Sequence, residues 1–228
     1  MRRGELGGGH RGRVGETWWA RGLAWLRTAS FTLAWLGGLN MTTIASAEAS
    51  PADEFKRGRA AQGEARRAHF QKGMEQARAL VDKDPKDPEG LFWLAVNMGA
   101  EALERGKMSA LPVVPKMERL LLKVDELEPG FAEGGAARVL GRLYDQAPAV
   151  VSVGSSSKAR KFLERALKLA PEHPGNQAFA ADFLKDNGER DRAKKLAASA
   201  LATLEAAGDK YGDEGKEWRK IARDVMDD

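Results

Sequence analysis

The 228-residue sequence contains no cysteine, and this absence excludes several kinds of protein. Without cysteine the chain has no disulfide framework, so its hydrophobic core alone must hold the fold together. A bacterial lipoprotein needs a cysteine directly after its leader, so no lipid anchor is expected. Histidine is also scarce, with three residues in the chain. A zinc site built from cysteine and histidine lacks ligands here, and we expect no metal and no cofactor.

Long hydrophobic runs are also lacking, except near the N-terminus. The first 47 residues contain six arginines and two glutamates, and they end with an apolar run over 31–44 and Ala45-Ser46-Ala47. A basic segment, a short apolar segment and a small-residue site in this order are typical of a secretory signal peptide. The run is shorter than the roughly 20 residues of a membrane span. We therefore predict a signal peptide or hydrophobic leader over 1–47, a domain over 48–228 and a periplasmic location. An uncleaved membrane anchor is the alternative.

The positive charge of the chain belongs to this leader. The whole sequence has a formal net charge of +4, whereas residues 48–228 contain equal numbers of basic and acidic residues. No block rich in lysine or arginine follows the leader, so no nucleic-acid partner is expected.

Residues 48–228 predict an all-α fold. They show no sustained alternation of apolar and polar residues, and good helix formers dominate the segments between prolines and glycines. About eight helices are expected, over 53–83, 89–105, 113–127, 131–146, 156–170, 175–185, 189–207 and 213–226. In the last of these, Trp218 is expected to anchor a capping helix over the array.

The stretch 153–158, Val-Gly-Ser-Ser-Ser-Lys, has some likeness to a phosphate-binding loop. That loop needs a glycine before its lysine and a hydroxyl residue after it. Here Ser157 precedes Lys158 and Ala159 follows it, so the motif fails at both places. The sequence favours a helix start, with Ser156 or Ser157 as the N-cap.

A repeated pattern of small and large residues follows this stretch. Tetratricopeptide repeats have a period of 34 residues, and this offset separates the two sets of second-helix positions. The first set is Ala159, Leu163, Ala166 and Leu167; the second is Ala193, Ala197, Ala200 and Leu201. A first-helix set precedes them at Ala137, Leu140, Gly141 and Tyr144. We predict a tetratricopeptide-like array of helical hairpins, either an α-solenoid or a compact helical bundle.

Two segments in this array are similar to one family. They are Leu140–Pro148, "LGRLYDQAP", and Lys158–Pro171, "KARKFLERALKLAP", with Gly154-Ser155-Ser156 between them. Together they resemble the periplasmic T-component (TatT-like) family of TRAP transporters, mainly over 131–207. The resemblance implies a non-enzymatic accessory protein of TRAP-type solute uptake that associates with a periplasmic solute-binding protein. It also implies an apolar channel that could admit a small hydrophobic ligand. The family usually has a lipobox cysteine, which this chain lacks.

Two apolar loops are the first candidates for a binding surface. "MSALPVVP" and "APAVVSV" each separate the two helices of a pair, and equivalent loops of successive repeats share one edge of an array. Apolar residues in such loops are typical of binding surfaces. The partner-binding candidates are Val113, Pro148, Val150 and Gly154. The alternative is that both loops fold back and cap the core.

A ligand wall is the second candidate. Trp93 and Asn97 lie four residues apart and share a helix face, and an indole beside a carboxamide suits a pocket wall. Tyr144 is a further wall candidate. The alternative for Trp93 and Tyr144 is packing within the core.

No catalytic motif is present. The sequence contains neither H-E-x-x-H nor G-x-S-x-G, and we expect the protein not to be an enzyme. Two non-enzymatic functions, both based on binding another protein, remain. One is the TRAP accessory component, and the other is a general tetratricopeptide scaffold of the periplasm or envelope that binds other proteins.

Overall fold

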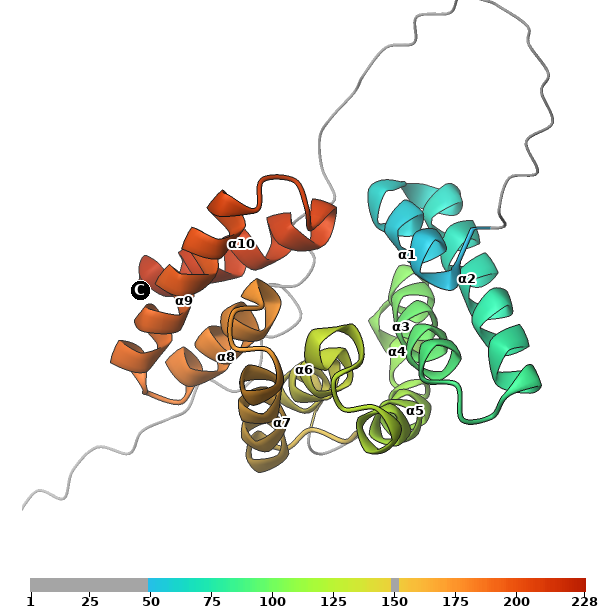
Figure 1. Ribbon diagram of the computed structural model, residues 1–228, viewed down its shortest axis with the longest axis horizontal. Helices are drawn as coiled ribbons and strands as arrows, with labels where there is room; N and C mark the ends of the chain where they lie inside the picture. Colours follow the sequence, from blue (N-terminus) through green and yellow to red (C-terminus); the bar gives the residue numbers. More distant parts are fainter. Residues whose placement is uncertain (1–48, 149–151) are drawn as a thin grey trace, which may run out of the picture. The chain divides into compact units, whose positions relative to one another are not determined.

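A computed structural model of the chain describes residues 49–148 and 152–228 (Figure 1). Within these residues there are ten α-helices and no strand, so the predicted all-α fold is confirmed. The predicted leader over 1–47 lies outside the described residues. The helices are α1 Pro51–Ala60, α2 Gly63–Lys83, α3 Pro88–Glu104, α4 Lys107–Ala110, α5 Val114–Leu127, α6 Phe131–Gln146, α7 Ser156–Leu169, α8 Pro174–Asp186, α9 Arg190–Ala206 and α10 Gly212–Met226.

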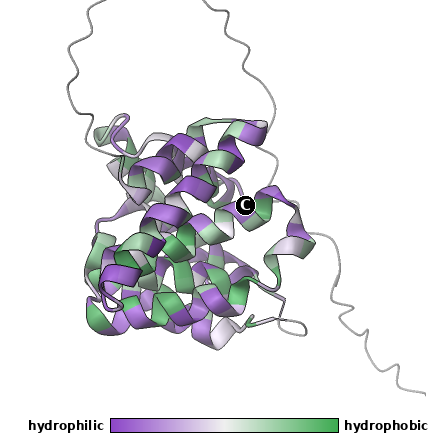
Figure 2. Ribbon diagram, turned by 90° about the vertical axis from the view of Figure 1, so that its right-hand side faces the viewer, coloured by the Kyte–Doolittle hydropathy of each residue, from purple (hydrophilic) through white to green (hydrophobic). Residues whose placement is uncertain are grey.

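Helices that are neighbours in sequence pack against each other. Contacts join α1 to α2, α2 to α3, α3 to α5, and then each helix to the next as far as α10. Figure 1 shows this succession in chain order from blue to red. Each helix carries both hydrophilic and hydrophobic residues, drawn purple and green in Figure 2. Such amphipathic helices bury one face only when they stack on neighbours, so the array is stabilised by these contacts.

The single helix predicted over 53–83 is wrong, because the chain breaks between α1 and α2. Ala61 is extended, and Gly63 has a φ of +57°. Arg66 donates to the carbonyl oxygen of Ala61 at 2.8 Å, which satisfies a free group at the end of α1. The break lets α1 fold back, so that the rings of Phe55 and Phe70 lie 5.8 Å apart. The short helix α4 inside the predicted loop accounts for the other extra helix.

The small residues of the repeated pattern lie where helices touch. Alanines at the second-helix positions of α7 and α9 are fully buried: Ala159, Ala166, Ala193, Ala197 and Ala200. In α6, Gly141 lies so close to α7 that an added Cβ would stand 2.6 Å from Cγ of Leu163. Close approach of this kind requires small residues, which confirms the helical array at these positions.

The first turn of α6 is left-handed. Ala132, Glu133 and Gly134 have φ values of 49°, 55° and 76°. Only glycine adopts this region without a steric cost, so the turn must be held by its surroundings. Arg138, which is buried, donates to the carbonyl oxygens of Ala132 and Glu133 at 3.4–3.5 Å and to Oδ1 of Asn176 at 2.9 Å. One guanidinium thus joins the strained turn to α8.

The first described helix also touches the last. Arg59 of α1 lies 2.7 Å from the carboxylate of Glu217 in α10, and it donates to the carbonyl oxygen of Asp213 at 3.4 Å. Trp218, two turns into α10, is 4% exposed and belongs to the main core. The expected capping helix is therefore confirmed, and it contacts α1 as well as α8 and α9.

Candidate functional site

The first apolar loop exposes a side chain other than the one predicted. Val113 is half-buried and packs against the small core cluster of Ala77, Leu94 and Met98. Met108 in α4 is instead 78% exposed, and Leu103 at the end of α3 is 45% exposed. Methionine is flexible and polarisable, which suits it to contacts with a partner. Val113 remains a predicted contact, but Met108 and Leu103 offer more apolar surface on this edge.

The second apolar loop lies partly outside the described residues. Val150 is among the residues that the structure does not describe, whereas Pro148 and Gly154 are described and half-buried. Val153 packs against the main core. Ser155 accepts a hydrogen bond from the backbone N–H of Lys158 and so caps α7, one residue before the predicted cap. The described ends of this loop are therefore held against the array.

Trp93 and Asn97 lie beneath α1. Asn97 is fully buried, and its Nδ2 donates to the carbonyl oxygens of Pro51 at 3.2 Å and Trp93 at 2.9 Å. The indole of Trp93 is partly exposed and lies 5.5 Å from the ring of Phe55 and 5.0 Å from that of Phe92. These contacts hold α1 on α3. A role in ligand binding stays a prediction for both residues.

Tyr144 anchors a polar cluster between α5, α6 and α7. It is buried, and its hydroxyl donates to Oε1 of Glu118 at 2.6 Å. Burial and the neighbouring Glu118 carboxylate both raise the pKa of Tyr144, so the phenol stays neutral. Lys158 lies 3.4 Å from the same carboxylate and above the Tyr144 ring. The lysine of the Gly-Ser stretch thus pairs with an acidic side chain of the protein.

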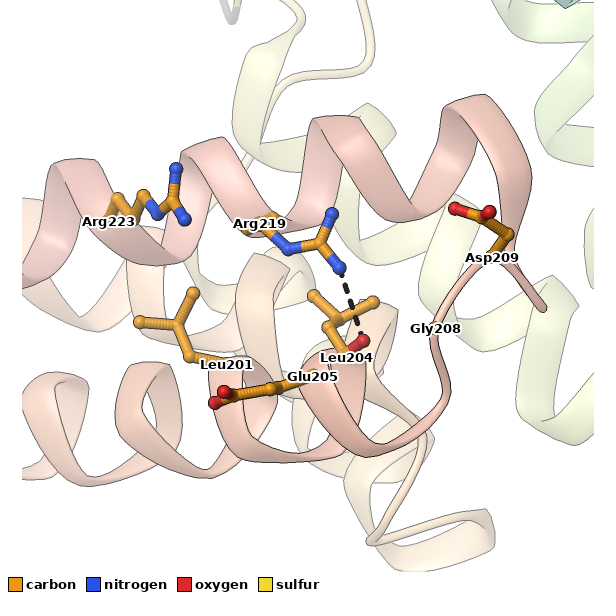
Figure 3. A pocket seen from close by; sticks show the side chains of 7 residues that line it. All are labelled: Leu201, Leu204, Glu205, Gly208, Asp209, Arg219 and Arg223. Carbon is orange, nitrogen blue, oxygen red and sulfur yellow. Dashed lines mark hydrogen bonds between the residues drawn. The ribbon is translucent and has the colours of Figure 1, made fainter.

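A pocket lies elsewhere, between α9 and α10 (Figure 3). Its volume is about 490 Å³, and it is lined by Leu201, Leu204, Glu205, Gly208, Asp209, Arg219 and Arg223. Arg219 donates to the carbonyl oxygen of Leu204 at 3.1 Å. None of the seven predicted site residues lines it. The sequence held one signal for it, the i,i+4 spacing of Arg219 and Arg223, which puts both on one face of α10.

The described residues hold no group of three or more potential metal ligands. Nδ1 of His69 lies 2.7 Å from Oε2 of the fully buried Glu54, which also contacts Arg57 and Lys72. Nδ1 of His173 accepts from the backbone N–H groups of Gly175 and Asn176 and so caps α8. Both histidines are therefore occupied with helix packing and capping.

An all-α array of paired helices with apolar inter-helix loops offers surfaces for binding another molecule. The family model of the TRAP transporter T-component matches residues 57–207. This match covers more than half of the chain, so the chain belongs to that family. T-components are extracytoplasmic accessory proteins of solute transport and are not known as enzymes. A search of curated proteins found no match. Among the described helices, none is both long and apolar enough to cross a membrane.

Proposed function

We propose that this protein is a non-enzymatic, exported accessory component of a TRAP-type uptake system that associates with the periplasmic solute-binding protein of that system. The observation that supports this most directly is the family match over 57–207. It covers α2 to α9 in full, so it includes both apolar loops and all the hairpins between them.

We assign the contact with the solute-binding protein to the α3–α5 connector, residues 105–113, together with Leu103. Met108 is the most exposed large apolar side chain of the described residues, and Leu103 is a second exposed apolar side chain five residues before it. Gly106, the second residue of this connector, has a φ of +108°. Apolar side chains at the centre of an interface contribute most of its binding energy, so Met108 is the first residue to test.

Binding of the purified protein to the solute-binding protein of the same transport system can be measured by calorimetry. We expect Met108→Asp to weaken this binding by about tenfold or more, because a charge would be desolvated at the interface. The melting temperature should stay nearly unchanged, since the side chain is already in solvent.

Met226→Asp is the matched control, because Met226 is also exposed but lies at the end of α10. It should leave the affinity unchanged. Equal loss of binding in both variants would contradict the assigned surface. Failure of the unaltered protein to bind the solute-binding protein, with normal uptake in a strain lacking the protein, would overturn the transport role and favour a general scaffold.

A further inference from the structure

The pocket between α9 and α10 has a lining of mixed chemistry. Leu201 and Leu204 point from α9 toward α10, and Arg219 reaches from α10 toward α9 (Figure 3). Asp209 lies at the loop that joins the two helices. The volume of about 490 Å³ falls within the range of small-molecule sites. Four lining residues, Gly208, Asp209, Arg219 and Arg223, follow residue 207 and so lie outside the family match.

The four charged side chains of this pocket are not paired with one another. No ion pair within 4.0 Å joins Glu205, Asp209, Arg219 or Arg223 to any residue in the part of the chain that the structure describes. Elsewhere arginines do form such pairs, as Arg142 does with Asp145 and Asp182. The pocket therefore holds two charges of each sign with capacity left for a ligand.

The arginines keep most of their donors free. Arg219 spends one N–H on the carbonyl oxygen of Leu204, which lies in the last turn of α9 and has no partner within its helix. A guanidinium has five N–H donors, so Arg219 retains several. Arg223 is exposed, and its side chain forms no hydrogen bond with any residue in 49–148 or 152–228. Two guanidiniums on one helix face can bind a carboxylate from both sides.

A ligand of one charge alone would gain little here. A simple anion would meet the carboxylates of Glu205 and Asp209, and a simple cation would meet the two arginines. A ligand that carries both charges gains from both signs, and an aliphatic side chain beside the two charges can rest on Leu201 and Leu204. We propose that this pocket binds an aliphatic α-amino acid as its zwitterion, with the carboxylate on Arg219 and Arg223 and the ammonium group on Glu205. The site does not depend on the transport role proposed above.

Titration of the ¹⁵N-labelled full chain at low salt, followed by NMR, tests this proposal with four probes. Leucine carries a positive charge, a negative charge and an aliphatic group. N-acetylleucine lacks the positive charge, leucinamide lacks the negative charge, and glycine lacks the aliphatic group. We expect leucine to shift the amide signals of 201–209 and 219–223 most strongly, and each other probe to bind about tenfold more weakly or worse. No shift with leucine, or equal binding of N-acetylleucine, would overturn the proposal.

Two variants locate the site. Arg223→Gln should weaken leucine binding by about tenfold, because a charge-assisted hydrogen bond to the carboxylate is lost. Arg78→Gln is the matched control, since Arg78 is also exposed but lies on α2. It should bind leucine as the unaltered protein does. If Arg223→Gln binds leucine with unchanged affinity, the site is not in this pocket.

Glu205→Gln tests the ammonium side. Glu205 is exposed, so the fold should tolerate the change. Leucine should bind more weakly, whereas N-acetylleucine should bind more tightly because a repelling carboxylate is gone. Unchanged affinity for both probes would contradict the proposed orientation of the ligand.

Discussion

Gly141 in α6 faces α7 at a distance that leaves no room for a side chain. A Cβ at this position would lie 2.6 Å from Cγ and 3.0 Å from the backbone nitrogen of Leu163. A backbone atom cannot move aside as a flexible side chain can, so the two helices would have to separate. We expect Gly141→Ala to lower the free energy of unfolding by about 1–3 kcal/mol, measured by urea denaturation.

Gly130 provides the control for this prediction. It has a φ of −78°, and an added Cβ would meet no atom within 4 Å. Gly130→Ala should therefore be neutral or stabilising by up to about 1 kcal/mol, because alanine restricts the unfolded chain. If Gly141→Ala proved as harmless as Gly130→Ala, this result would contradict the close contact between α6 and α7.

His173 makes the stability of the protein depend on pH. Burial, and then the positive charges of Arg138 and Lys210, lower its pKa to about 3, although Glu133 lies 3.6 Å from Nε2. The neutral ring is needed because Nδ1 accepts hydrogen bonds at the start of α8. In the unfolded chain the imidazole has its ordinary pKa of about 6.5. The unfolded state therefore binds the proton first, and stability is lost as the pH falls below about 6.5.

His173→Asn isolates this effect, since asparagine is also a good N-cap. Between pH 7.5 and pH 5 the unaltered protein should lose about 2 kcal/mol more stability than the variant. Urea denaturation of both proteins at the two pH values measures the difference, and other titrating groups cancel in the comparison. Parallel losses would show that His173 accepts a proton in the folded state.

At the scale of the helices, the left-handed first turn of α6 is held by Arg138, a side chain that lies after this turn. Arg138→Met removes the donors that hold the carbonyl oxygens of Ala132 and Glu133 while keeping a similar length of side chain. We expect a loss of about 1.5–3 kcal/mol, because hydrogen bonds from a charged group are removed from a buried site. Amide hydrogen exchange over 131–138 should become faster, since the left-handed turn would no longer be held.

Arg142→Met is the same change one turn later in α6. Arg142 is 24% exposed and pairs with Asp145 and Asp182, so its loss should cost about 1 kcal/mol or less. It should leave the exchange of 131–138 unchanged. Equal effects of the two variants would contradict a special role for Arg138.

The helices that could be predicted from the sequence are those in which small residues recur at a fixed spacing along the chain. Alanines at fixed spacing in α7 and α9 predict a buried helix face without knowledge of the partner. The break between α1 and α2 could not be found, because residues 60–63, Ala-Ala-Gln-Gly, contain no proline. Its cause is tertiary: Gly58 packs so closely on Phe70 that an added Cβ would stand 2.5 Å from the ring.

Site residues were harder to predict, because their partners are distant in sequence. Asn97 donates to the carbonyl of Pro51, 46 residues away, and Arg138 bonds to Asn176, 38 residues away. A carboxamide or guanidinium gives no sign in the sequence of which group it will meet. The α9–α10 pocket is lined by charged side chains that form no ion pair within the described part of the chain. The sequence does not show which charged side chains will lack such a partner.

At the scale of the whole molecule, the leader prediction has a specific test. We expect cleavage after Ala47, or after Ala49. Either cut would leave Ser50, which caps α1 through reciprocal hydrogen bonds with Asp53. Intact-mass analysis of protein from the envelope fraction should show one of these two N-termini. A full-length mass in the membrane fraction would support the uncleaved anchor, and a full-length mass in the cytoplasm would contradict export.

The ion pair between Arg59 and Glu217 joins the first described helix of the array to the last. Repeat proteins whose two ends are free can lengthen when a repeat is duplicated, because each new repeat contacts only its neighbours. Here an added hairpin between α7 and α8 would carry α10 away from α1 and break the contact that joins them. Variation in length is therefore expected in the inter-helix loops, while the number of hairpins stays constant.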